Sequence, residues 1–203
     1  MKIVSSFQAF SGISWWVAAM KADTVLLDAG EYFQKMSYRN RYRITGSNNS
    51  ILLSVPLVDG RNQRIPMGEV RIHNGERWQT QHWRSLVSVY KRAPFFDHYE
   101  DSLRPLFDAT YSKLIDFDRE SVLWVKRQLK LDMAIEETDT FINQYPSEVR
   151  DLRFGKTKLG YFPKYYQVFE DRIGFLPDMS ILDLLFSEGP AAARLLSMGV
   201  MSI

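Results

Sequence analysis

The chain has 203 residues and contains no cysteine. Disulfide bonds, thiolate catalysis and thiolate metal sites are therefore excluded, and packing alone must stabilise the fold. Long hydrophobic runs are also missing, because the longest one, around residues 13–20, is far below the roughly 20 residues that span a bilayer. No apolar signal-peptide core follows Lys2. We therefore expect a cytoplasmic protein without a transmembrane segment.

A strong excess of charge of one sign is also absent, since 26 basic side chains are balanced by 24 acidic ones. Nucleic-acid-binding domains usually carry a basic excess on one face, so no nucleic acid is expected as a partner. The three histidines lack the spacing of metal ligands, and no metal site is predicted. The motifs G-x-G-x-x-G, G-x-x-x-x-G-K-[ST] and G-x-S-x-G are missing, which disfavours standard dinucleotide, P-loop and serine-hydrolase mechanisms. No cofactor is expected.

Composition and patterning predict a single α/β domain over residues 1–203. The chain is 45% hydrophobic and 14% aromatic, which is enough for a large core. The N-terminal third is expected to form a mixed sheet, with strands over residues 2–5, 24–28, 35–44, 51–58 and 69–72 and a helix over 14–22 that Ser14 caps. Packed helices are expected in the middle and at the C-terminus, over residues 77–91, 101–109, 118–131, 180–187 and 191–198. Residues 145–164 are expected to be a long loop.

The most informative segment runs from Lys35 to Arg43 and reads K-M-S-Y-R-N-R-Y-R. In an extended strand, one face would present four cations, namely Lys35, Arg39, Arg41 and Arg43. Guanidinium groups bind phosphate and carboxylate bidentately, so this face is a candidate site for an anionic ligand. The alternative is a charged edge strand whose cations prevent edge-to-edge pairing.

Two polar residues are candidates for catalysis. Asp28 ends a predicted strand, where ligands bind in open α/β sheets, and it could act as a general base. The alternative, which we favour, is an ion pair with an arginine of the next strand. His82 lies between Trp78 and Leu86 on one helical face and could act as a general acid or base. A buried histidine that bonds a main-chain carbonyl is the alternative.

An aromatic group follows the helix over residues 77–91 and consists of Tyr90, Phe95, Phe96 and Tyr99. These rings could stack on a sugar or a base. Aromatic side chains more often close a core, and that interpretation is favoured.

Several of these segments, taken in order, resemble the WbqC-like family, which is named after a protein encoded among bacterial O-antigen genes. The resemblance starts with Asp28 and the K-x-S-x-R-N-R-x-R-I pattern over residues 35–44. It continues in L-S-V-P over residues 53–56, in the helix with Trp78, His82 and Trp83, and in Y-K-x-A-P-F-F over residues 90–96. The segments 165–169 and 180–190 resemble the branch found in Bacteroidetes-type bacteria.

The resemblance implies a setting in surface-glycan synthesis more strongly than it implies a reaction. Our leading hypothesis is a cytoplasmic enzyme of this family that transfers a group to or from a phosphorylated or nucleotide-activated sugar in surface-polysaccharide synthesis. Its partner would be an anionic small molecule, a sugar phosphate or nucleotide-sugar. Asp28 and His82 are the candidate catalytic residues. The candidate ligand-binding residues are Lys35, Arg39, Asn40, Arg41, Arg43 and Tyr90.

One departure from the family favours a different function. Many members carry H-Q-P where this chain has Ser5-Ser6-Phe7. A non-catalytic protein that binds a glycan precursor, or a partner in the biosynthetic machinery, is therefore the alternative. A third interpretation makes the basic segment and residues 150–164 a contact surface for anionic lipid.

Overall fold

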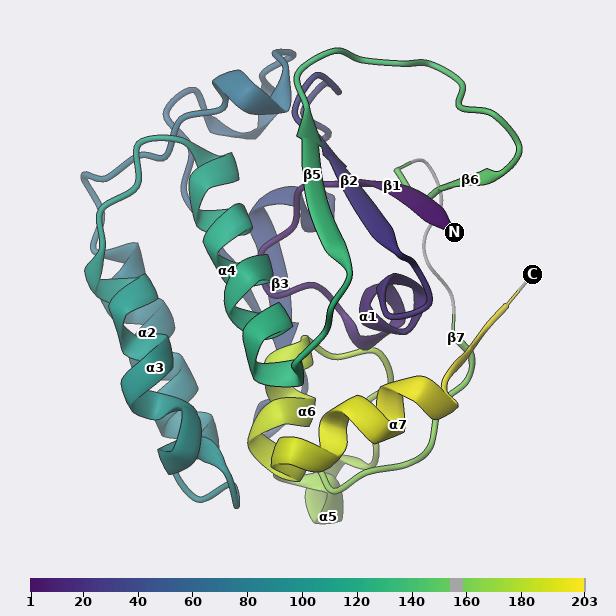
Figure 1. The fold of residues 1–203 in the computed structure, drawn as a ribbon. Coiled ribbons are helices and arrows are strands. Elements are labelled where there is room, and N and C mark those ends of the chain that lie inside the picture. Colours follow the sequence, from purple (N-terminus) through teal and green to yellow (C-terminus); the bar gives the residue numbers. More distant parts are fainter. Residues whose placement is uncertain (154–158, 203) are drawn as a thin grey trace.

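A computed structural model describes residues 1–153 and 159–202 of the chain (Figure 1). Its centre is a four-stranded sheet in the order β5-β2-β1-β6, and every pair of neighbours is parallel. The strands are β1 (Lys2–Ser6), β2 (Thr24–Asp28), β5 (Ala134–Thr138) and β6 (Val149–Asp151). The α/β class is confirmed. Two of these strands, β5 and β6, come from beyond the N-terminal third.

The two central strands are buried because their sequences are almost continuously apolar. Ile3, Val4, Val25 and Leu27 are fully buried, as expected for parallel strands that are covered on both faces. Helix α4 (Leu114–Leu129) lies on one side of the sheet and helix α1 (Ile13–Ala19) on the other (Figure 1). Helix α1 begins one residue before Ser14, with Gly12 as its N-cap, so the predicted cap was wrong.

The order of the sheet reverses at β1. The chain adds β2 and then β5 on one side of β1, and it later adds β6 on the other side. The carboxyl ends of neighbouring strands meet at one edge, where Ser6 is in register with Asp28, and Asp28 with Thr138. Open α/β sheets bind ligands outside the carboxyl ends of their strands at such a reversal.

The basic segment is not one strand. Ser37 accepts a hydrogen bond from the backbone N–H of Arg39 at 3.4 Å and caps the 3-10 helix η1 (Tyr38–Asn40). Extended structure begins only in β3 (Arg41–Ile44), because the local bonds of Ser37 compete with a strand ladder. The prediction of four cations on one strand face was therefore wrong. The hairpin is confirmed, since β3 pairs antiparallel with β4 (Ile51–Ser54).

The middle of the chain is helical, as predicted. The helix predicted over residues 77–91 is α2 (Trp78–Tyr90). The next helix, α3 (Phe96–Asp108), begins five residues before its predicted start and contains Pro105 in its interior. Short 3-10 helices, η2 (Gly60–Asn62) and η3 (Met67–Glu69), precede α2, and η3 ends at the residue where a strand was predicted to begin.

Helix α6 (Ile181–Glu188) has Ser180 as its N-cap, and the hydroxyl of Ser180 accepts the N–H of Leu182. The helices around it are α5 (Glu170–Ile173), η4 (Gly189–Ala191) and α7 (Ala192–Met198). Strands β7 (Leu159–Tyr161) and β8 (Val200–Met201) pair antiparallel. The predicted loop over 145–164 contains β6 and all of β7, and its residues 154–158 lie outside the described part. Among the described helices, none is both long and apolar enough to cross a membrane.

The segment before α1 and the segment before α6 are bonded to each other across most of the chain. The N–H of Ile13 donates to the carbonyl of Met179, and the N–H of Ile181 donates to the carbonyl of Ser11, both at 3.0 Å. The hydroxyl of Ser180 donates to the carbonyl of Phe10 at 2.8 Å. The end of the chain therefore fixes the loop that follows β1.

A buried carboxylate, Asp183 of α6, connects several parts of the core. It is fully buried and accepts hydrogen bonds from Thr45 Oγ1, Tyr90 OH and Tyr165 OH, each at 2.6 Å. Gln167 Nε2 donates to it at 2.9 Å. Burial and the nearby charge of Asp183 raise the pKa of both tyrosines well above 10.0. This carboxylate therefore connects α6 to the residue after β3, to α2 and to the segment before α5.

A second buried carboxylate, Asp118 of α4, lacks such partners. It is fully buried, and neither of its oxygens has a hydrogen-bond partner among the described residues. Burial raises its pKa well above 3.8, against a smaller opposing effect of the Arg119 charge. The protonated form is therefore favoured in the folded protein.

We expect Asp118→Asn to stabilise the protein increasingly as the pH rises. A carboxyl group with a raised folded pKa contributes stability that is lost as the pH rises through that pKa, whereas asparagine does not ionise. The gain should be on the order of 1 kcal/mol at about pH 8. Thermal unfolding across the pH range measures it, with the exposed Asp101→Asn as control. Equal pH profiles of the wild type and Asp118→Asn would contradict this.

Candidate functional site

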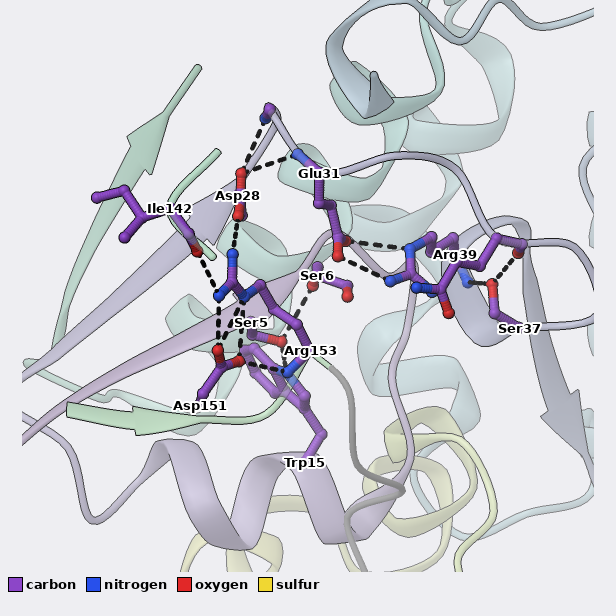
Figure 2. Close-up of polar contacts among 12 residues, drawn as sticks. Ser5, Ser6, Trp15, Asp28, Glu31, Ser37, Arg39, Ile142, Asp151 and Arg153 are labelled. Atoms are coloured by element: carbon purple, nitrogen blue, oxygen red, sulfur yellow. Dashed lines mark hydrogen bonds and ion pairs between the residues drawn. The ribbon is translucent and has the colours of Figure 1, made fainter. Parts of the chain in front are cut away.

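A buried charged cluster occupies the carboxyl edge of the sheet. The guanidinium of Arg153, two residues beyond β6, lies between two carboxylates (Figure 2). Its Nη1 donates to Asp28 Oδ2 at 2.5 Å, and its Nη2 donates to Asp151 Oδ2 at 2.6 Å. The arginine therefore bridges the ends of β2 and β6 across β1.

A second ion pair lies beside the first. Arg39 donates from Nε and Nη2 to the two oxygens of Glu31 at 3.0 and 2.8 Å (Figure 2). Arg39 is 4% exposed and Glu31 is 1% exposed. Asp28 accepts the backbone N–H groups of Gly30 and Glu31, which places both acids on one tight turn after β2.

Negative charge predominates in this cluster, because three carboxylates face two guanidinium groups. Burial is the main cause that raises the pKa of Glu31, and the charge of Asp28 adds to it. Hydrogen bonds from Arg39 and Ser6, together with the positive charge of Arg39, oppose that shift. Glu31 is thus the acid whose pKa the site raises, and a raised pKa favours a role as general acid or base.

Two serines complete the cluster from the end of β1. Ser5 and Ser6 are buried, at 0% and 2% exposure. Ser5 accepts the indole N–H of Trp15 at 2.7 Å, and Ser6 donates to Glu31. Ser5 and Ser6 therefore lie inside the cluster.

The structure separates the other residues of the basic segment. Lys35 is exposed, and Asn40 donates its side-chain N–H to the carbonyl of Val55 at 3.0 Å. Arg41 and Arg43 are half-buried on one face of β3, and Arg41 Nε donates to the carbonyl of Ser37. Of the cations predicted from this segment, only Arg39 joins the cluster, and it does so as the partner of a carboxylate.

Tyr90 and His82, a candidate ligand-binding residue and a candidate catalytic residue, both lie in the core, away from solvent. Tyr90 is fully buried and donates to Asp183. His82 is 3% exposed, and its Nε2 lies 3.2 Å from the carbonyl of Ser54. That carbonyl can only accept, so Nε2 carries the proton and Nδ1 accepts from Tyr42 OH at 3.0 Å. His82 therefore has the contacts of a structural histidine.

We expect the imidazole of His82 to stay neutral at pH values well below the usual pKa of histidine. Burial lowers its pKa from 6.5 to about 4 in the folded state. A depressed pKa contributes stability that is present above about pH 6.5 and is lost as the pH falls toward 4. NMR titration of the ring measures this pKa directly. A titration midpoint near pH 6.5 would contradict the lowered pKa of His82. So would a His82→Asn variant that loses as much stability in acid as the wild type.

Sequence reasoning missed Glu31, Asp151 and Arg153 as members of the cluster. The only signal for the last two is the alternation Asp151-Leu152-Arg153 after a three-residue strand. Asp28 does form an ion pair with an arginine, as favoured from the sequence, but that arginine follows β6 and is 125 residues away. Among the described residues, no group of three or more acidic, histidine or cysteine side chains could hold a metal ion.

The comparisons with known proteins give one family. The model of the WbqC-like protein family matches residues 13–154, which is more than half of the chain. This range contains all five charged residues of the cluster and ends before α6, and Ser5 and Ser6 precede it. Searches of curated proteins and of solved structures found no match. The Bacteroidetes-type branch stays a prediction. The chain belongs to the WbqC-like protein family.

Proposed function

We propose that this protein transfers a group to or from a phosphorylated or nucleotide-activated sugar during bacterial surface-polysaccharide synthesis, of the O-antigen type. The observation that supports this most is the buried charged cluster at the carboxyl edge of the parallel sheet, where the strand order reverses. The edge is the usual ligand site of such sheets. Membership in the WbqC-like family supports the biosynthetic setting, because the family is named after a protein encoded among bacterial O-antigen genes.

In this proposal, Glu31 and Asp28 act on the hydroxyl or amine that reacts. Glu31 has the raised proton affinity that a general acid or base needs, and Asp28 is held rigidly by two backbone N–H groups. The anionic part of the substrate binds to Lys35, Arg41 and Arg43, because Arg39 is already paired with Glu31. His82 and Tyr90 support the core below and have no part in the chemistry.

A thermal-shift screen tests the binding step. A ligand that binds only the folded state raises the melting temperature by mass action. Nucleotide-sugars, nucleotides, acyl-coenzyme A compounds and plain phosphate are the probes. We expect a selective shift that the Arg41→Gln/Arg43→Gln double variant loses, with affinity falling by about tenfold or more. The exposed Arg84→Gln on α2 is the control and should keep the shift. An unchanged affinity in the double variant would exclude these two arginines as ligands.

A second candidate is a non-catalytic protein that binds a glycan precursor or a partner of the biosynthetic machinery. It is favoured by the saturation of the cluster, in which both guanidinium groups are already paired with carboxylates. Turnover separates the two functions. An enzyme converts the ligand found in the screen to product, and Glu31→Gln abolishes the conversion. A binding protein returns the ligand unchanged.

A further inference from the structure

The charged cluster is closed in this structure. Asp28 is fully buried, Glu31 is 1% exposed and Arg153 is 4% exposed. A substrate therefore reaches these side chains only if a covering segment moves. The chain between β5 and β6, residues 139–148, is that segment, and we refer to it as the strap. Figure 1 shows it as the long green connection that leaves the carboxyl end of β5.

The strap is built differently from the body of the protein. It contains no helix or strand, and nine of its ten residues are exposed, the exception being the half-buried Tyr145. Phe141 and Ile142 expose 39% and 42% of their surface. Segments with few buried contacts and little regular hydrogen bonding open at low free energy while the core stays folded.

The strap nevertheless passes directly over the cluster. A Cβ atom on Gly30 would lie only 2.5 Å from the carbonyl oxygen of Asp139 and from the amide nitrogen of Phe141. Gly30 follows Asp28 by two residues and donates its N–H to that carboxylate. The absence of a side chain at Gly30 therefore allows the strap to close on the turn that carries both acids.

Arg153 holds the strap in this position. Its Nη2 donates to the carbonyl of Ile142 at 2.8 Å. Its guanidinium also lies over two rings of the strap, 5.2 Å from the centroid of Phe141 and 5.0 Å from that of Tyr145. The same guanidinium binds Asp28 and Asp151, so one side chain connects the strap to the acids beneath it.

We propose that the strap is a lid with Arg153 as its latch, and that it opens without unfolding of the sheet to admit the ligand to Asp28 and Glu31. This inference rests on the proposed site at the carboxyl edge. The guanidinium of Arg153 combines a hydrogen bond to the strap, two cation–π contacts with its rings and ion pairs with the acids beneath it. Because one group makes all these contacts, breaking them releases the strap as a unit. An anionic ligand that competes with Asp28 or Asp151 for the guanidinium would favour the open state.

The absence of cysteine gives a direct test. Ser6→Cys places a single thiol in the cluster, on the strand face that it shares with Asp28. Ser187→Cys places one at a buried position in α6 whose hydroxyl has no partner among the described residues, so the substitution should be tolerated. With the folded full-length protein and a water-soluble thiol reagent, we expect Ser6→Cys to react at least about ten times faster than Ser187→Cys.

The latch is tested in the Ser6→Cys background. Arg153→Lys keeps the charge but loses the planar fork, so labelling should accelerate by about tenfold. Arg150→Lys, an exposed arginine on β6, is the matched control and should leave the rate unchanged. Equal slow labelling at Ser6→Cys and Ser187→Cys would overturn the lid, and this comparison holds even if Arg153→Lys does not fold. Equal labelling with Lys and Arg at 153 would overturn the latch.

These experiments contain no ligand, so their outcome is separate from that of the thermal-shift screen. A closed strap together with a selective thermal shift would place the ligand elsewhere, at the half-buried arginines of β3. Fast labelling of Ser6→Cys without any thermal shift would support the lid and exclude the proposed ligand class.

Discussion

Asp183→Ala is expected to cause a large loss of stability, about 3–5 kcal/mol. The substitution removes the acceptor of four buried donors, which are Thr45, Tyr90, Tyr165 and Gln167. A buried donor without a partner costs about 1–3 kcal/mol. These donors come from the residue after β3, from α2 and from the segment before α5, so several elements should loosen together.

Urea and thermal unfolding measure this loss. The melting temperature should fall by on the order of 10 °C for a chain of this size. Asp183→Asn keeps one acceptor oxygen and should lose less. Asp171→Ala, an exposed acid on α5, is the control and should change little. A melting temperature of Asp183→Ala within about 2 °C of the wild type would show that the network contributes little.

Arg39→Met is expected to destabilise the protein by about 3–5 kcal/mol, because it leaves Glu31 as an unpaired buried charge. Both oxygens of Glu31 are bound by the guanidinium, at 3.0 and 2.8 Å. If Arg39 were instead an exposed ligand-binding residue, the substitution would remove ligand affinity and leave stability almost unchanged. Stability and binding therefore distinguish the two roles of this arginine.

A double-mutant cycle isolates the pair. Removing both partners in Arg39→Met/Glu31→Leu should recover most of the lost stability, since replacing a buried ion pair by apolar side chains is often neutral. The coupling between the two sites should be about 2 kcal/mol or more. Arg41→Met, on the half-buried face of β3, serves as the matched control. Additive effects of the two substitutions would contradict the buried pair.

The sequence predicts the parts of this fold that local patterns determine. The strand β2 and the helical spacing of α2 each depend on only a few neighbouring residues, and both predictions are confirmed. The prediction of one strand over residues 35–44 was wrong for a local reason. The hydroxyl of Ser37 forms hydrogen bonds with the backbone of its neighbours, and these bonds favour a 3-10 turn.

The strands that complete the sheet could not be predicted in this way. β5 is exposed and acidic, and β6 has three residues, so neither carries a hydrophobic alternation. The ion pairs of the cluster could not be predicted from local patterns either. Asp28 was found because it ends a recognisable strand, but its partner Arg153 follows a strand that has no sequence signature. Pairings over 125 residues depend on the order of the sheet.

The bonds between the segment after β1 and the segment before α6 have a consequence for synthesis on the ribosome. Phe10, Ser11 and Ile13 find their partners only when Met179, Ser180 and Ile181 have been made. At about 5–20 residues per second, the start of the chain waits roughly ten to thirty seconds for them. During that time the apolar side chains of α1 lack the α6 and α7 surfaces that cover them. Until its last helices emerge, the nascent chain therefore exposes apolar surface that the folded protein buries.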